Sequence, residues 1–294
     1  MLSRESPLAR AGAQRKLYTA PSVNGELRQG RTQAMIRVGM RRWIAALCVL
    51  AGLGAVQAEA ADKVKVGFSP EPYAPFWIQD TSGKWDGFEV ELIDALFKQM
   101  GKDYELVPVA WDGLIPSLQE GKIDAIMNSM SATEERKQVV DFSDKYYETT
   151  VSFYGRKDQP FDYSEAGLKG KVVAVQTATS QLSWLQQKWG NVVEIKLYDT
   201  QDNADADLQS GRVDYGIADT VYTAEGFLKS DAGKDYELKG APISDPLIGG
   251  NVGAAMRKGD PLLGEMNAAI KALRENGTYK AINDKYFAFD VFGG

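Results

Sequence analysis

The stretch that decides the fold of this chain runs from Ile123 to Tyr147 and reads IDAIMNSMSATEERKQVVDFSDKYY. Its first five residues form a short apolar run, which predicts a strand. Three short polar side chains follow at once, Asn128, Ser129 and Ser131, and Arg136 lies on a short predicted helical turn. A planar guanidinium beside hydroxyl groups is well suited to hold a carboxylate through two hydrogen bonds.

Predicted strands and helices alternate on both sides of this stretch. The first series has strands at 64–68, 104–108 and 123–127 and helices at 88–100 and 114–119. A similar series begins at Gly170, with strands at 171–175, 192–198 and 213–218 and helices at 179–188, 203–209 and 220–228. Residues 259–286 are mostly helical, with a break at Asn276 and Gly277. This alternation is typical of an α/β fold with parallel pairing.

Two α/β units in series predict two lobes with a hinge between them. The units are joined near 149–155, and the glycine-rich run at 249–253 is interpreted as a return crossing. We therefore expect residues 61–152 and 250–294 in lobe 1 and residues 153–249 in lobe 2. Each polar loop considered below follows a predicted strand, which fits a single cleft between the lobes.

The N-terminal region reads as an export signal. Met40-Arg41-Arg42 precedes an apolar run at 43–53, and Ala58-Glu59-Ala60 fits a cleavage site, so residues 35–60 predict a secretory signal peptide. The alternative is an uncleaved anchor helix. Residues 1–34 are polar and lack periodicity, which indicates a non-native or mis-assigned extension and a true start at Met35 or Met40.

Composition excludes several classes of function. The chain has no histidine, which rules out a Ser-His-Asp triad and a Cys-His dyad. Its single cysteine, Cys48, leaves with the signal, so no histidine or cysteine zinc site is expected. Cleavage before Ala61 would leave 25 basic and 37 acidic residues of the original 34 and 40, a net charge of about −12. Such an acidic chain argues against nucleic-acid binding. We also expect no cofactor.

Four segments together resemble one known family. They are residues 128–147, Trp85 to Leu92 (WDGFEVEL, similar to a family G-F-D-V-D-L), Leu114 to Leu118 and Asp141 to Ser143. In order and spacing they resemble the periplasmic polar-amino-acid-binding proteins of ABC importers, solute-binding family 3, of the lysine/arginine/ornithine-, histidine- and glutamine-binding type. The resemblance covers nearly all of residues 62–287.

The resemblance implies a fold and a function. The fold would be a two-lobed periplasmic-binding-protein fold of type II, each lobe a mostly parallel sheet flanked by helices. The protein would be a periplasmic monomer and not an enzyme, capturing an L-amino acid by lobe closure for a membrane permease. One alternative is an enzyme of the same fold that resembles cyclohexadienyl dehydratases, and another is an extracytoplasmic amino-acid sensor.

The resemblance also assigns residues to the two charged ends of an amino acid. Ser129, Ser131 and Arg136 would grip the α-carboxylate, and Ser180 would be a second hold at a helix start. Asp219 would pair with the α-ammonium. Each assignment has an alternative. The serines could hydrogen-bond only to nearby backbone groups, Arg136 could be a solvated helix charge, residues 179–180 could cap a helix, and Asp219 could be a helix N-cap.

The ligand side chain would meet a different group of residues. Tyr73 and Trp111 match positions of aromatic or apolar walls, with Asn128 beside them, although ordinary core packing is the alternative. Glu71 lies in the loop after the first strand, where it could face a guanidinium or ammonium or point to solvent. The sequence therefore favours, weakly, a basic or polar amino acid.

Overall fold

The computed structural model describes residues 63–293. The expected extension, signal peptide, cleavage site and Cys48 all lie outside these residues. No helix within 63–293 combines the length and apolar character needed to cross a bilayer.

The first sheet has five strands in the order β4-β1-β5-β14-β6. Their bounds are β4 (Tyr104–Pro108), β1 (Val64–Phe68), β5 (Ala125–Ile126), β14 (Ala255–Met256) and β6 (Asp141–Phe142). β1 pairs in parallel with both β4 and β5, whereas β14 pairs antiparallel with β5 and β6. Four of the five strands therefore point the same way, and the single reversed strand is the one that follows the return crossing.

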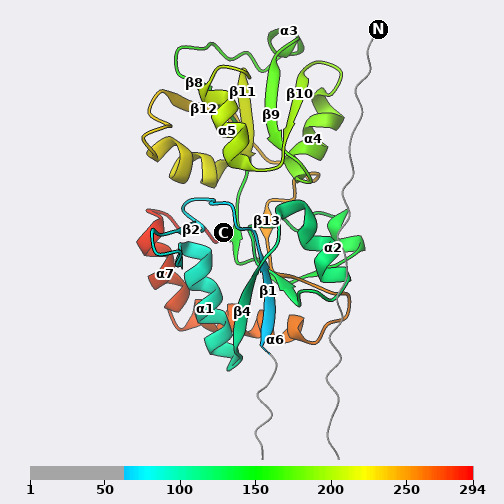
Figure 1. The fold of residues 1–294 in the computed structure, drawn as a ribbon, viewed down its shortest axis with the longest axis vertical. Helices are drawn as coiled ribbons and strands as arrows, with labels where there is room; N and C mark the ends of the chain where they lie inside the picture. Colours follow the sequence, from blue (N-terminus) through cyan, green and yellow to red (C-terminus); the bar gives the residue numbers. More distant parts are fainter. Residues whose placement is uncertain (1–62, 294) are drawn as a thin grey trace, which may run out of the picture. The chain divides into compact units, whose positions relative to one another are not determined.

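Helices from both ends of the chain pack beside this sheet, as Figure 1 shows for α1 and α6. They are α1 (Phe88–Met100), α2 (Leu114–Gln119), α6 (Leu262–Glu275) and α7 (Thr278–Tyr286). α1 buries a stripe at helical spacing, including Leu92, Ile93 and Leu96, and ends where Gly101 adopts the left-handed conformation. α1 contacts α6 and α7, so the C-terminal helices complete the core of the first sheet.

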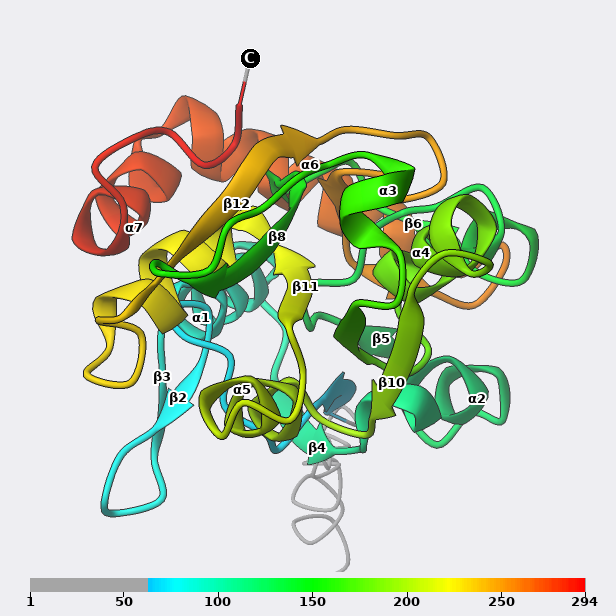
Figure 2. The ribbon, with the colours of Figure 1, turned by 90° about the horizontal axis from the view of Figure 1, so that it is seen from above.

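The second sheet repeats this design with the order β10-β9-β11-β8-β12. Its strands are β10 (Glu194–Tyr198), β9 (Val172–Gln176), β11 (Tyr215–Asp219), β8 (Val151–Arg156) and β12 (Tyr236–Ile243). β9 pairs in parallel with β10 and β11, and β8 pairs antiparallel with β11 and β12. Figure 2 shows α5 (Gln201–Gln209) on one side of this sheet and α3 (Glu165–Leu168) and α4 (Ser180–Trp189) on the other.

Two crossings join the sheets, and they lie side by side. β7 (Tyr147–Glu148) leads toward β8, and β13 (Asn251–Val252) leads back to β14, with β7 and β13 paired antiparallel. The first crossing is shorter than the 149–155 expected from sequence, because residues from Val151 onward already belong to β8. The predicted helix at 220–228 is also irregular, with a π-helical turn (Tyr222–Gly226) and a 3-10 turn (Phe227–Lys229).

Short elements complete the described chain. They are the hairpin β2 (Ile78–Gln79) and β3 (Trp85–Asp86) and the 3-10 turns Trp111–Gly113 and Arg136–Gln138. The turn at Arg136 is the short helical turn expected from sequence. Residues that follow β1 and β5 of the first sheet and β9 of the second, and the last residue of β11, all line one cavity, as is typical of the carboxyl ends of parallel strands.

Candidate ligand-binding site

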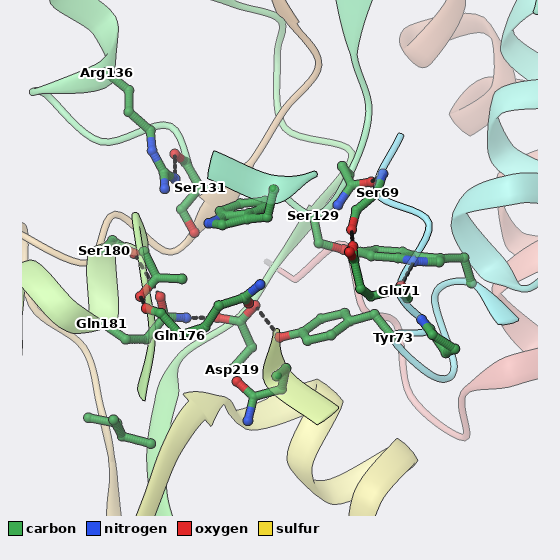
Figure 3. Close-up of a pocket in the computed structure, with 17 residues that line it drawn as sticks. Ser69, Glu71, Tyr73, Ser129, Ser131, Arg136, Gln176, Ser180, Gln181 and Asp219 are labelled. Carbon is green, nitrogen blue, oxygen red and sulfur yellow. Dashed lines mark hydrogen bonds between the residues drawn. The ribbon is translucent and has the colours of Figure 1, made fainter. Parts of the chain in front are cut away.

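All nine residues selected from the sequence line one cavity. They are Glu71, Tyr73, Trp111, Asn128, Ser129, Ser131, Arg136, Ser180 and Asp219. Figure 3 shows most of them pointing toward a common space. A cavity lined by aromatic groups together with a few placed polar groups is typical of small-molecule sites.

Arg136 forms the cationic end of the cavity. One guanidinium nitrogen, Nη1, donates to the carbonyl of Ser131 at 2.9 Å, and Nη2 donates to the carbonyl of Ala178 at 3.0 Å. The guanidinium also lies 5.5 Å from the ring centroid of Trp111, whose indole N–H donates to the same Ala178 carbonyl at 3.2 Å. Burial lowers the pKa of Arg136 to about 10, so the group stays cationic at neutral pH. Arg136 is therefore fixed in place and is not a freely solvated charge.

Hydroxyl groups and a helix start surround this cation. The Ser131 hydroxyl makes no hydrogen bond within residues 63–293, although Ser131 is only 4% exposed. The Thr179 side chain caps α4 by accepting from the Leu182 amide at 3.2 Å, which matches the capping alternative for that residue. The hydroxyl of Ser180, the first residue of α4, donates to the side-chain oxygen of Gln181 at 3.3 Å. The open N–H groups of a helix start favour an anion.

Asp219 forms the anionic end of the cavity. It is 4% exposed, and its carboxylate accepts from the Tyr73 hydroxyl at 3.0 Å and from the Gln181 amide at 2.7 Å. Burial raises the pKa of Asp219 to about 6, against the opposing effects of the Tyr73 and Gln181 hydrogen bonds and the Arg136 charge. No backbone amide among the described residues donates to this carboxylate, so the side chain does not act as the expected alternative, an N-cap.

An aromatic wall connects the two halves of the cavity. The Tyr73 ring, from the loop after β1, stacks on Tyr222 with centroids 4.1 Å apart and planes 8° apart. Tyr73 also stacks on Trp77, with centroids 5.1 Å apart. Nearby, a Cβ added to Gly226 would lie 2.1 Å from the Ala74 carbonyl oxygen, so the backbones approach closely here. Tyr73 is a pocket wall and a packing contact at once.

Glu71 and Asn128 lie at the side of the cavity formed by the first loop. Glu71 is half-buried and accepts a hydrogen bond from the Ser69 hydroxyl, while its backbone carbonyl accepts from the Trp77 indole at 2.6 Å. The Asn128 side-chain oxygen accepts from the Ser69 amide at 2.5 Å. These contacts hold the loop against the residues that follow β5, and Glu71 is among the residues that line the cavity.

Ser129 differs from its expected role as a donor to a carboxylate. It adopts a positive φ of 52°, and both of its donors are used by Glu89, a fully buried residue of α1. The Ser129 amide donates to Glu89 Oε1 at 2.9 Å, and the Ser129 hydroxyl donates to Oε2 at 3.0 Å. With both donors directed at Glu89, neither is left for a ligand carboxylate in this arrangement.

The structure adds cavity residues that the sequence analysis did not select. They include Ser69, Gln176, Gln181 and Gln201. Gln181 follows Ser180 in the first turn of α4, so the predicted helix start that selected Ser180 could also have selected Gln181. Gln201 lies on α5, and no local pattern distinguishes it from a surface residue. Among residues 63–293 no group of three or more acidic side chains is arranged to hold a metal ion.

Comparisons with known proteins agree with this geometry. The family model of bacterial extracellular solute-binding proteins, family 3, matches residues 64–289. An L-arginine-binding protein of Pseudomonas aeruginosa is 43% identical over 238 residues, covering 80% of this chain and 92% of that protein. A histidine-binding periplasmic protein of Salmonella typhimurium is 40% identical over 251 residues, covering 84% and 96%.

Solved structures confirm the expected fold. An ancestral arginine-binding protein bound to arginine superposes with a TM-score of 0.71 at 33% identity, covering 77% of this chain and 98% of its own. An ancestral amino-acid-binding protein, a precursor of cyclohexadienyl dehydratase, superposes with a TM-score of 0.66 at 32% identity, covering 76% and 95%. The two-lobed arrangement anticipated from alternating strands and helices is therefore confirmed.

Proposed function

The chain belongs to the bacterial extracellular solute-binding proteins of family 3, and we propose that it binds a basic L-amino acid, with arginine as the first candidate. The ligand would be delivered to the membrane permease of an ABC importer. Support comes from the cavity described above and from relatives that include arginine-, histidine- and lysine/arginine/ornithine-binding proteins.

One observation carries the proposal: the cavity holds a fixed cation and a buried anion. Arg136 follows β5 of the first sheet, and Asp219 ends β11 of the second. A free amino acid is a zwitterion whose carboxylate and ammonium complement these two groups. A ligand that contacts both sheets would bind best when the halves are close, which favours hinge closure.

The side chain of the ligand would be selected by the acidic and aromatic part of the cavity. Glu71 supplies a half-buried carboxylate, and Tyr73 and Trp111 supply ring faces. A guanidinium or ammonium would gain both a charge partner and a stacking surface there. We therefore expect arginine, lysine or ornithine to bind better than glutamate or aspartate.

The test is a thermal-shift screen of the purified protein against all common L-amino acids and ornithine, followed by calorimetric titration. A ligand that binds only the folded state raises the unfolding temperature by an amount that grows with the logarithm of its concentration divided by its dissociation constant. The Arg136→Ala variant is the matched control and should lose the shift. Stabilisation by acidic or aliphatic amino acids alone would refute the basic preference, and no stabilisation by any amino acid would refute the function.

Localisation, partners and lobe boundaries belong to the same proposal. Relatives named as periplasmic support export of the mature chain to the periplasm, where it would act as a monomer with a separate permease. The lobe boundaries expected from sequence, 61–152 with 250–294 and 153–249, stay a prediction.

An enzyme of this fold is the second candidate. The buried Asp219 has a raised pKa of about 6, a property that a general acid or base requires. One similar structure is an amino-acid-binding precursor of cyclohexadienyl dehydratase. Turnover of prephenate or arogenate by the purified protein would establish this alternative, and amino-acid binding without turnover would remove it.

A further inference from the structure

The indole N–H of Trp111 has no part in the function proposed above, which uses only the face of its ring. We propose that Trp111 is also a positioning residue: its N–H ties the two halves of the molecule together at the Ala178 carbonyl, and this bond sets how long a ligand is held and not which ligand is chosen. The inference rests on the proposed function, because it presupposes an amino acid that binds as the halves close.

The contacts of Trp111 cross from one sheet to the other. Trp111 begins the 3-10 turn that follows β4 of the first sheet, whereas Ala178 lies between β9 and α4 of the second. The Trp111 indole nitrogen donates to the Ala178 carbonyl at 3.2 Å, and Nη2 of Arg136 donates to the same oxygen at 3.0 Å. Arg136 follows β5, so one carbonyl oxygen of the second half accepts two hydrogen bonds from the first half.

The backbone that carries this carbonyl has an unusual conformation. Ala178 adopts a positive φ of 55°, which is unfavourable for a residue with a Cβ. Such a conformation persists only where the surrounding contacts fix it. The Thr179 cap of α4 fixes the turn from within the second half, and the two donors from the first half hold its carbonyl.

The shared carbonyl also orients the guanidinium that would hold the ligand's carboxylate. Arg136 donates from Nη1 to the Ser131 carbonyl and from Nη2 to the Ala178 carbonyl, and its other guanidinium N–H groups have no partner within residues 63–293. A planar guanidinium that is held at two points presents its remaining donors in a fixed plane, as bidentate binding of a carboxylate requires. Because Ala178 belongs to the second half, this arrangement is complete only when the halves are together.

The ring and the N–H of Trp111 can be separated by one substitution. The ring lies 5.5 Å from the Arg136 guanidinium, a contact within the first half, whereas the N–H reaches the second half. Phenylalanine keeps an aromatic face and lacks the N–H. Trp111 is half-buried, so the smaller ring of Trp111→Phe does not leave a cavity in a core. The variant should therefore fold and lose mainly the bond to Ala178.

The first experiment compares the wild type with Trp111→Phe by calorimetry and stopped-flow kinetics, with arginine, lysine and ornithine as ligands. Loss of one neutral hydrogen bond should lower all three affinities by a common factor of about threefold to tenfold. The loss should appear in the dissociation rate, with the association rate changing less than about twofold, because the bond forms only as the halves close around the ligand.

Trp85→Phe is the matched control. Trp85 packs against Phe68 and lies outside the cavity lining, so the same substitution there should change each affinity by less than about twofold. A loss in Trp111→Phe that differs more than about threefold among the three ligands would assign Trp111 to the ligand's side chain alone. A loss that appears in the association rate alone, or no loss at all, would equally overturn the inference.

The second experiment needs no variant. NMR should show that the Trp111 indole proton of the wild-type protein exchanges slowly with solvent when arginine is saturating and quickly without ligand, because the bond to Ala178 then opens with the halves. Fast exchange at saturation would overturn the inference, and this measurement decides the question if Trp111→Phe does not fold. If the wild type binds none of the three amino acids, the proposed function fails and the inference fails with it; if it binds them without these outcomes, the inference alone fails.

Discussion

Replacement of Asp219 by asparagine should make the ligand-free protein more stable while it damages ligand binding. The carboxylate is 4% exposed, and burial raises its pKa from 3.8 to about 6. The folded state therefore binds this proton more tightly than the unfolded state, so stability falls as pH rises from about 4 to about 6. Two pKa units correspond to about 3 kcal/mol, an upper bound on what Asp219→Asn restores at pH 8.

Binding should change in the opposite direction. Removing one partner of a buried, hydrogen-bonded charge pair costs about 2–5 kcal/mol, which is a loss of about 30-fold or more in affinity for arginine. δ-Guanidinovalerate, which is arginine without its α-ammonium, should bind the Asp219→Asn variant almost as tightly as it binds the wild type. Since the ligand requires ionised Asp219, wild-type affinity should also fall about tenfold per pH unit below about 6, and that dependence should vanish in the variant.

Calorimetric unfolding and titration at pH 4, 6 and 8 measure both effects. Asp205→Asn is the matched control, because Asp205 is equally buried, has its pKa raised to about 6, and lies outside the cavity lining. It should share the gain in stability at pH 8 and change arginine affinity less than about threefold. If Asp219→Asn is less stable than wild type at pH 8, or loses both ligands equally, Asp219 has a structural role and the reasoning fails.

Three other predictions concern the same cavity. Arg136→Ala removes the hydrogen bonds to the Ser131 and Ala178 carbonyls and should weaken arginine binding about 30-fold or more with the fold intact; near wild-type titration would exclude Arg136 from the site. Glu71→Gln should weaken basic ligands selectively, and an unchanged ligand ranking would mean that Glu71 does not contact the ligand. Saturation of the wild-type protein with arginine should lower its radius of gyration in small-angle scattering, and an unchanged scattering profile would contradict hinge closure. In Gly226→Ala the added Cβ would lie 2.1 Å from the Ala74 carbonyl oxygen, so this variant should show weaker closure and lower arginine affinity.

Local patterns were sufficient for most of the fold. Apolar spacing predicted α1 and its glycine end at Gly101, and short apolar runs predicted β1, β4 and β9 within about a residue. β8 was missed because its six residues are a buried antiparallel strand in which no alternation appears, so the sequence read as a connection. β12 was missed as well; its pairing depends on β8 and not on its own pattern.

The sequence by itself also determined which chemical groups follow the strands, and hence that an arginine follows one strand and an acidic residue ends another. Only the tertiary structure decided what those groups contact. Asp219 meets Tyr73, and Tyr73 stacks on Tyr222, across separations of about 150 residues that no local pattern encodes. The Ser129 hydroxyl faces Glu89 for the same reason, since the tertiary fold brings this buried carboxylate of α1 to the residues that follow β5. Burial, a property of the assembled core, then sets the pKa of Asp219 and Glu89 far from the values of the isolated side chains.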